Sequence, residues 1–192
     1  MAARGLTVYT GPMFSAKSSH LIADLNKYKM IRPRNVAAIE PVVTYITSRR
    51  DTRDYTTRGG HIRLADGIQQ IRTDKLGEVT MTRGQVVGID EAQFFDDLPL
   101  ITSWVDNGDC HVIVAGLVGD FQRRPFGRIH ELLPHVDAGR FHILPAVCQI
   151  CIERGEGERE ASFTRRYREE GQVEEIGGAD KYYPVCRKHF NE

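Results

Sequence analysis

The sequence predicts an α/β protein with a mainly parallel sheet, because apolar strands alternate with helical segments along most of the chain. The first expected strand covers residues 6–10 and stops at a glycine–proline pair. Two further apolar runs, at 85–90 and 111–116, have the character of buried strands. Between the first strand and Pro33, apolar residues recur at helical spacing: Leu21, Ile22, Leu25 and Tyr28.

The remaining elements are less regular. Residues 35–40 and 140–144 are expected to add strands, and residues 98–105 to form a helix. A second helix with its approaches is expected within 66–80. The stretch 42–61 is polar, β-branched and rich in arginine, and we interpret it as a long loop.

Composition narrows the functional classes. The chain has 192 residues, 41% apolar and 27% charged, which suits one ordinary domain with a small appendage. Lysine plus arginine and aspartate plus glutamate balance at 26 each, whereas a sequence-independent nucleic-acid binder carries a basic excess. No apolar run approaches the roughly 20 residues that span a bilayer, and the first strand begins too early for a signal peptide. We therefore expect a cytoplasmic protein that binds neither nucleic acid nor a membrane.

Segment 11–18 has the spacing of a phosphate-binding loop, with Ala16 where the motif asks for glycine. In such a loop backbone N–H groups surround the phosphates, Lys17 reaches the outer phosphates and the Ser18 hydroxyl ligates magnesium. The spacing also fits a plain strand–turn–helix corner, but its place between a strand and a helix favours phosphate binding. The expected phosphate-binding residues are Gly11, Pro12, Met13, Phe14, Ser15, Ala16, Lys17 and Ser18.

Two acids follow the strand at 85–90. Asp90 is suited to hold, with Ser18, the Mg²⁺ ion that accompanies ATP in a phosphate loop. Glu91 can act as a general base that takes a proton from water, as in an ATPase, or from a substrate hydroxyl, as in a kinase. The motif does not distinguish these reactions, and an ordinary solvated loop acid is the plain alternative.

Four residues near the C-terminus form two pairs with the spacing of a zinc site: Cys148 with Cys151, and Cys186 with His189. Three thiolates and an imidazole complete a tetrahedron, so the zinc would be structural; two unrelated coincidences are the alternative. Residues 152–185 are too polar to fold alone, and pinning both ends would make them a loop able to enclose a flat heterocycle. Cys110 is expected to be a packed thiol.

Several motifs in register resemble the type II thymidine kinases, from residue 6 to residue 190. They are Gly11-Pro-Met-Phe-Ser-Ala-Lys-Ser18, Asp90-Glu-Ala-Gln-Phe-Phe95, Phe121-Gln-Arg-Arg-Pro-Phe-Gly127, Ile176-Gly-Gly-Ala-Asp-Lys-Tyr182 and the two zinc pairs. The resemblance implies a RecA-like P-loop domain over 1–145 and a zinc-binding lasso domain over 146–192 that covers the nucleoside. It further implies ATP-dependent phosphorylation of the 5′-hydroxyl of thymidine, and often of deoxyuridine, by a homotetramer with thymidine triphosphate as feedback inhibitor.

The same resemblance assigns residue roles. Glu91 would be the general base, and Asp90 and Gln93 would line the nucleotide and metal side. The phosphates and the attacking hydroxyl would be approached by Asp51, Thr52 and Arg53. The base and sugar would be surrounded by Met13, Leu117, Phe121, Thr164 and Tyr182, although ordinary packing also explains such residues. The thymine edge would receive main-chain hydrogen bonds from Val173, Glu174, Glu175, Ile176 and Gly177.

Three features depart from the family pattern. Ala16 replaces a glycine, and would be strained by about 1 kcal/mol if a positive φ is required there. His189 stands where many relatives have a fourth cysteine, and it is an equally good zinc ligand. The stretch 42–50 is longer than usual, which makes the alignment of the following motif less secure.

Two other functions stay open at this stage. One is a zinc-containing P-loop ATPase acting on nucleic acid, for which the local basic cluster Arg165, Arg166 and Arg168 speaks. DNA-stimulated ATP hydrolysis without nucleoside dependence would identify it. The other is a catalytically weakened binding protein descended from a kinase, for which Ala16 gives slight grounds. That protein would bind thymidine or its triphosphate without turnover.

Overall fold

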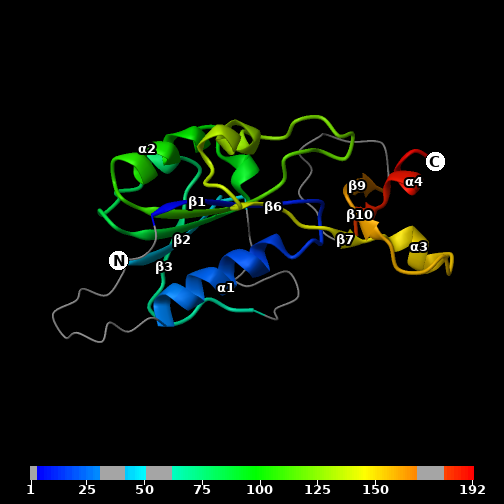
Figure 1. The fold of residues 1–192 in the computed structure, drawn as a ribbon, viewed down its shortest axis with the longest axis horizontal. Coiled ribbons are helices and arrows are strands. Elements are labelled where there is room, and N and C mark those ends of the chain that lie inside the picture. The colour runs from blue at the N-terminus through cyan, green and yellow to red at the C-terminus, as the bar shows by residue number, and fades with distance from the viewer. Residues whose placement is uncertain (1–3, 31–41, 51–61, 168–179) are drawn as a thin grey trace.

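The computed structural model describes residues 4–30, 42–50, 62–167 and 180–192. In this part of the chain a six-stranded sheet forms the centre, and all of its paired strands run parallel, in the order β3-β2-β4-β5-β1-β6 (Figure 1). The strands are β1 (Gly5–Thr10), β2 (Val43–Thr47), β3 (Gln69–Arg72), β4 (Val86–Asp90), β5 (His111–Ala115) and β6 (Phe141–Ile143). The predicted α/β class with a mainly parallel sheet is thereby confirmed.

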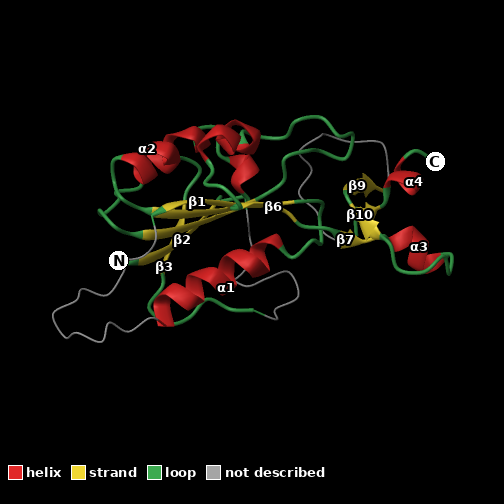
Figure 2. Ribbon diagram, in the orientation of Figure 1, coloured by secondary structure: helices red, strands yellow, loops and turns green. Residues whose placement is uncertain are grey.

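Helices cover both faces of this sheet, which explains why its central strands β4 and β5 are buried along their whole length and mostly apolar (Figure 2). Helix α1 (Lys17–Met30) lies on one face and contributes Leu21, Ile22 and Leu25 to the core there. The other face is covered by α2 (Ile101–Asp106) and short 3₁₀ segments, η1 (Leu76–Glu78), η2 (Ala92–Phe94), η3 (Leu98–Leu100) and η4 (Ile129–His135).

Close packing sets the position of α1 against the middle of the sheet. A Cβ atom placed on Gly88, in β4, would lie 2.6 Å from Leu25 Cδ1 and 3.1 Å from Leu21 Cδ2. Only glycine permits this approach, because the helix side chains fill the space that a larger residue would need. As a result the start of α1 reaches the carboxyl ends of β1 and β4, where ligands bind in open parallel sheets.

Most of the predicted elements are present. Strands β4, β5 and β6 and helix α1 fall at their expected places, and the expected helix at 98–105 is η3 continued by α2. The expected strand at 35–40 lies outside the described residues.

Two predictions were wrong. The stretch 42–61 was interpreted as a loop, but β2 occupies Val43–Thr47 and is fully buried between β3 and β4. The hydroxyl of its buried Thr44 is satisfied inside the protein, because it meets the side chains of Gln69 and Gln85. The expected helix at 66–80 is instead the edge strand β3 followed by η1.

The described C-terminal residues, 146–167 and 180–192, are called here the C-terminal module. They form two small antiparallel sheets and two short helices beyond the carboxyl end of the central sheet (Figure 1). Their elements are β7 (Ala146–Val147), α3 (Gln149–Glu153), β8 (Glu160–Ala161), β9 (Phe163–Arg166), β10 (Tyr182–Val185) and α4 (Arg187–Phe190). Among the described helices, none has the length and apolar character that crossing a bilayer requires.

Candidate functional site

The loop between β1 and α1 is a tight turn closed by its own side chains. The Ser15 hydroxyl donates to the carbonyl oxygen of Pro12 at 2.9 Å, and the Lys17 ammonium donates to the same oxygen at 2.6 Å. The amide of His20 donates to the carbonyl oxygen of Ala16, so the hydrogen-bond ladder of the helix starts at the end of this loop. The loop therefore stands at the positive end of α1, where anions are favoured.

Backbone geometry in this loop is demanding. Gly11 has φ +139°, and a Cβ atom there would overlap the carbonyl oxygen of Leu144 and lie 2.9 Å from Ser15 Oγ. Phe14 and Ala16 also adopt positive φ, 67° and 59°. Ala16 therefore has the positive φ at which strain was expected. A left-handed conformation costs a residue with a Cβ atom about 1 kcal/mol.

Asp90, at the carboxyl end of β4, joins the loop to the neighbouring strand. Its side chain is 2% exposed and accepts hydrogen bonds from the hydroxyls of Ser18 and Tyr45, each at 2.9 Å. The amide of Glu91 also donates to Asp90, at 2.9 Å. The two residues expected to hold magnesium are therefore adjacent. Tyr45 was missed because it lies in β2, which the sequence analysis had interpreted as loop.

Glu91 follows Asp90 in a left-handed conformation, with φ 50° and ψ 42°. This turn ends β4 and starts η2, so Glu91 directly follows the Asp90–Ser18 pair, and its backbone amide donates to Asp90. Its carboxylate accepts a hydrogen bond of 2.7 Å from the amide of Gln93. An uncommon backbone conformation at a carboxylate beside a phosphate loop is typical of a functional position.

The residues expected around base and sugar come from the central α/β part of the chain and from the C-terminal module, and contacts connect the two groups. The Met13 amide of the loop donates to the Thr164 hydroxyl of β9 at 2.9 Å. The guanidinium carbon of Arg166 lies 5.6 Å from the ring centre of Phe121 and 5.7 Å from that of Tyr182. The structure thus connects four of the five expected residues in two pairs.

The fifth, Leu117, donates its amide to the Gln93 side chain at 2.9 Å. Arg166 was considered in the sequence only as part of a basic cluster, yet it is 9% exposed and contacts two aromatic rings. The remaining expected contacts lie outside the described residues: Asp51, Thr52, Arg53, Val173, Glu174, Glu175, Ile176 and Gly177.

A second centre in the C-terminal module brings together the four predicted metal ligands. Cys148, Cys151, Cys186 and His189 are all buried, and their ligand atoms lie within 4.8 Å of one another. His189 Nδ1 is 3.4 Å from the sulfur atoms of Cys148 and Cys151 and 3.5 Å from that of Cys186, and the sulfurs of Cys151 and Cys186 are 4.0 Å apart.

These separations match a metal tetrahedron. Zinc–sulfur bonds of about 2.3 Å and zinc–nitrogen bonds of about 2.0–2.1 Å imply edges of roughly 3.8 Å between sulfurs and 3.6 Å between sulfur and nitrogen. Burial raises the pKa of the Cys148 thiol, but hydrogen bonds from His189 and the cysteine neighbours outweigh burial and lower it, whereas burial and the other two thiols raise the pKa of Cys151. The four residues can therefore hold a metal ion.

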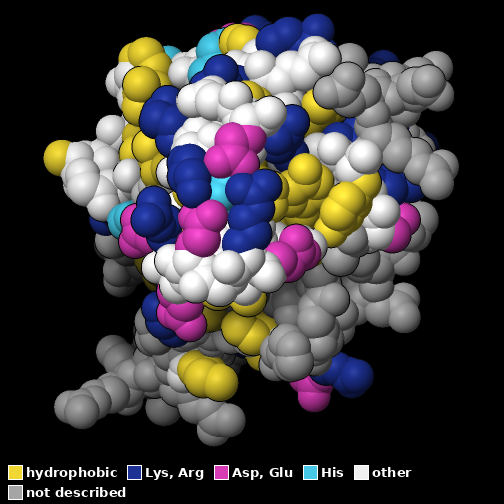
Figure 3. Space-filling model, turned by 90° about the vertical axis from the view of Figure 1, so that its right-hand side faces the viewer, with side chains coloured by type: hydrophobic (Ala, Val, Ile, Leu, Met, Phe, Trp, Pro, Cys, Tyr) yellow, Lys and Arg dark blue, Asp and Glu magenta, His cyan; other side chains and the backbone are white. Residues whose placement is uncertain are grey.

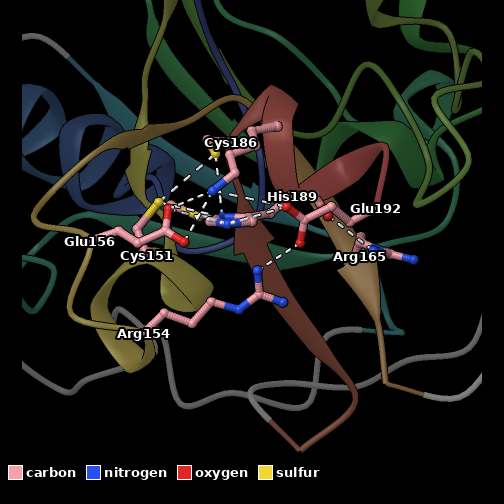
Figure 4. A network of polar contacts seen from close by, with 9 residues as sticks. Cys151, Arg154, Glu156, Arg165, Cys186, His189 and Glu192 are labelled. Carbon is pink, nitrogen blue, oxygen red and sulfur yellow. Dashed lines mark hydrogen bonds and ion pairs between the residues drawn. The ribbon is translucent and has the colours of Figure 1, made fainter.

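Carboxylates lie behind the imidazole of His189 (Figure 4). Its buried Nε2 is 3.5 Å from Glu156 Oε2 and 3.9 Å from Glu192 Oε1. The Lys188 ammonium donates to both oxygens of Glu156, at 3.0 and 2.8 Å, and this hydrogen bond lowers the pKa of the Glu156 carboxyl. Among the described residues no hydrogen bond joins Nε2 to a carboxylate, but Glu156 lies where the outer carboxylate partner of a metal-binding histidine is commonly found.

Cys110 has no place in that centre. Its thiol is buried in the main core, 3.6 Å from the carbonyl oxygens of Thr82 and Gly108, and burial raises its pKa. The prediction that it is a packed thiol agrees with this position.

A parallel sheet, a loop of phosphate-binding spacing at its carboxyl edge and two acids at the end of β4 define the P-loop class of α/β proteins. The family model for thymidine kinase matches residues 4–190, and the chain belongs to the thymidine kinase family. The resemblance found in the sequence is thereby confirmed.

Curated relatives come from animals, a plant and viruses. The protein named "Thymidine kinase, cytosolic" of Gallus gallus is 38% identical over 183 residues, which cover 95% of this chain and 75% of the relative. The protein of the same name from Homo sapiens is 35% identical over 185 residues, 95% of this chain and 71% of the relative. "Thymidine kinase" of Vaccinia virus (strain Ankara) is 37% identical over 182 residues, with 94% and 93% covered.

Proposed function

We propose that this protein transfers the terminal phosphoryl group of ATP to the 5′-hydroxyl of thymidine. Membership of the thymidine kinase family supports the substrate. The observation that carries the chemistry is the placement of Glu91 beside the Asp90–Ser18 pair at the edge of the phosphate loop.

In this reaction Glu91 is the general base. It accepts the proton of the 5′-hydroxyl while the oxygen of that hydroxyl forms a bond to the γ-phosphorus and the bond between that phosphorus and the bridging oxygen of ADP breaks. Proton, phosphoryl group and leaving group are then all accounted for, and the products are thymidine monophosphate and ADP.

Ser18 and Asp90 are proposed to hold the magnesium ion of the ATP complex. Ser18 Oγ and Asp90 Oδ1 are 2.9 Å apart, which equals the separation of about 2.9 Å between neighbouring oxygens of an octahedral Mg²⁺ site with bonds of 2.0–2.1 Å. Magnesium would neutralise charge on the phosphate oxygens. Tyr45 would keep Asp90 oriented, because its hydroxyl occupies the other carboxylate oxygen.

The rest of segment 11–18 and the motif at 51–53 are proposed to bind the phosphates. The nucleoside is proposed to lie among Met13, Leu117, Phe121, Thr164 and Tyr182, with main-chain contacts from residues 173–177. The bond from Met13 to Thr164 supports this placement, because it fixes the phosphate loop against the C-terminal module.

Zinc is the proposed occupant of the Cys148–Cys151–Cys186–His189 centre. Its donor set and separations suit that ion, and four protein ligands leave no coordination position for a substrate. We therefore assign zinc a structural role in a unit of residues 146–192 that covers the nucleoside.

Thymidine-dependent release of ADP, measured against the other deoxynucleosides and deoxyuridine, tests the proposal. Turnover with thymidine well above that with deoxyadenosine, deoxyguanosine and deoxycytidine supports it. ATP hydrolysis that DNA stimulates and thymidine does not would replace it with the nucleic-acid ATPase.

No observation favours that ATPase. Arg165 donates to the carbonyl oxygen of His189 and Arg166 is buried, so two members of the basic cluster have internal roles. On the end of the molecule that carries the C-terminal module, Lys and Arg side chains are interspersed with Asp and Glu (Figure 3). A nucleic-acid groove would gather positive charge instead.

Assembly, regulation and location are also proposals. We expect a cytoplasmic homotetramer that thymidine triphosphate inhibits; two relatives bear the word cytosolic in their names. Light scattering coupled to size exclusion measures the assembly, and a mass of one chain would contradict it. Inhibition of thymidine turnover by the triphosphate measures the regulation.

A further inference from the structure

Gln93 is a buried side chain at the point where β4, η2 and the segment after β5 meet. It is 4% exposed, and the family resemblance would have it line the nucleotide. Both ends of its amide are engaged inside the protein. The Leu117 amide donates to Gln93 Oε1 at 2.9 Å, and Gln93 Nε2 donates to Glu91 Oε2 at 2.7 Å.

The orientation of this amide is determined by its partners. A backbone N–H is only a donor, so the Gln93 atom that faces Leu117 must be the carbonyl oxygen. The NH₂ group is then directed at the Glu91 carboxylate, which as an ion is only an acceptor. The reverse orientation would place a donor against a donor and an acceptor against an acceptor.

Two glycines pack closely against Gln93. A Cβ atom on Gly116 would lie 2.6 Å from Gln93 Oε1 and 3.0 Å from the nitrogen of Ala92. A Cβ atom on Gly127 would overlap the carbonyl oxygen of Gln93 and lie 2.6 Å from its Cα, and Gly127 has φ +63°. Because backbone is packed this closely around it, Gln93 has little room to turn toward a ligand.

We propose that Gln93 is a positioning residue that holds the Glu91 carboxylate in the direction of the substrate hydroxyl. Glu91 lies on a left-handed turn, and its side chain has three rotatable bonds, which the buried Nε2 donor of Gln93 helps to restrain. The Leu117 amide holds the other end of the Gln93 side chain, so hydrogen bonds connect the segment after β5 to Glu91 at the end of β4. This inference rests on the proposed role of Glu91 and gives Gln93 a function toward the base, not toward ATP.

The test compares two buried glutamines of equal exposure. Gln93→Met keeps the volume and removes both polar ends. Gln85→Met is the matched control, because Gln85 is also 4% exposed and its amide likewise contacts two residues, Thr44 and Thr82, just before the start of β4, at the opposite end of that strand from Gln93. We expect kcat to fall about 10–100-fold in Gln93→Met, part of the 100–10,000-fold that general bases contribute, with Kd for ATP and both KM values within about 2-fold. Gln85→Met should lower Tm and leave kcat unchanged.

A double variant separates positioning from independent catalysis. If Gln93 acts through Glu91, the variant with Glu91→Gln and Gln93→Met has the turnover of Glu91→Gln alone. Losses that multiply would contradict the proposal. So would a kcat loss of equal size in Gln85→Met, or weakened ATP binding with unchanged kcat in Gln93→Met.

Failure of this inference is distinguishable from failure of the proposed function. Full turnover in Glu91→Gln would show that Glu91 is not the general base, and the proposed function would lose its mechanism. An inactive Glu91→Gln together with a fully active Gln93→Met would contradict only the positioning role of Gln93. If Gln93→Met does not fold, Gln93→Asn keeps the amide but is one methylene too short to span Glu91 and Leu117. The same kcat loss is expected there, and wild-type kcat would overturn the proposal.

Discussion

At the carboxyl edge of the central sheet, segment 11–18 and the two acids Asp90 and Glu91 are attached to parallel strands that pack in a large apolar core. Gly11 and Ala16 in this region have positive φ. In the C-terminal module, three thiols belong to the core itself, beside small residues such as Ala146 and Ala161. Strain at the first region is balanced by packing that exists without a ligand. The second region has a small apolar core, so we propose that its order depends on a metal ion held by these ligands. Variants that attack packing and variants that attack the metal should therefore behave differently.

The largest effect is expected from removing a metal ligand. Cys148→Ser should abolish stoichiometric zinc and unfold the C-terminal module, because structural zinc contributes on the order of 10 kcal/mol to such modules. Hydrogen exchange, with metal analysis of the same sample, should lose protection in 146–167 and 180–192 and keep it in β1, β4 and β5. A metal-free variant with full protection in the module would contradict this dependence.

Gly11→Ala should be the most damaging change in the phosphate loop. The added Cβ overlaps the Leu144 carbonyl oxygen, so loop or strand must shift, and we expect a loss of about 1–3 kcal/mol in the free energy of unfolding together with weaker ATP binding. Gly139→Ala is the matched control, because Gly139 has φ +75° with nothing within 4 Å of a Cβ. It isolates conformational strain from overlap. Equal effects of both variants on ATP binding would refute the overlap.

An intermediate effect, on the affinity for zinc, is expected from changing Glu156, which lies next to the outer nitrogen of His189. Glu156→Ala removes the carboxylate nearest His189 Nε2, and outer partners of metal-bound histidines contribute about 10–100-fold to metal affinity. Zinc transfer to a competing chelator should become faster by about that factor. The exposed neighbour Glu158, changed to alanine, should release zinc at the wild-type rate. Equal rates of zinc transfer in the two variants would show that Glu156 does not stabilise the bound metal.

The smallest effect is expected at Ala16. Ala16→Gly relieves a left-handed conformation, φ 59°, and should stabilise the protein by up to about 1 kcal/mol, less the entropy that glycine loses on folding. Denaturant unfolding in the absence of nucleotide measures it. A less stable Ala16→Gly variant would show that the alanine is not strained in the free protein.

Local spacing predicts a large part of both regions. Segment 11–18, the acids Asp90 and Glu91 and the four metal ligands each belong to short motifs whose chemistry requires neighbours in the sequence. The sequence does not reveal partners that strand order brings in. Tyr45 reaches Asp90 because β2 lies beside β4, and Leu117 reaches Gln93 because β5 lies on the other side.

Polar composition misled the prediction for β2 and β3. Val43–Thr47 consists of β-branched and aromatic residues, which strands favour, but the polar and charged residues around it outweighed that signal. Thr44 is fully buried and meets the side chains of Gln69 and Gln85. Such satisfaction appears only once the strands are paired, and no local pattern encodes it. Gln93 was noticed for its place in a motif, whereas its amide orientation follows from contacts 24 residues away.

The most direct measurement of the central claim is turnover of Glu91→Gln with thymidine and ATP, alongside its affinity for ATP. As an amide cannot accept the hydroxyl proton, we predict a fall in kcat of about 100–10,000-fold with Kd for ATP nearly unchanged. Near-wild-type turnover in that variant would contradict the role of Glu91 and, with it, the account of the active site.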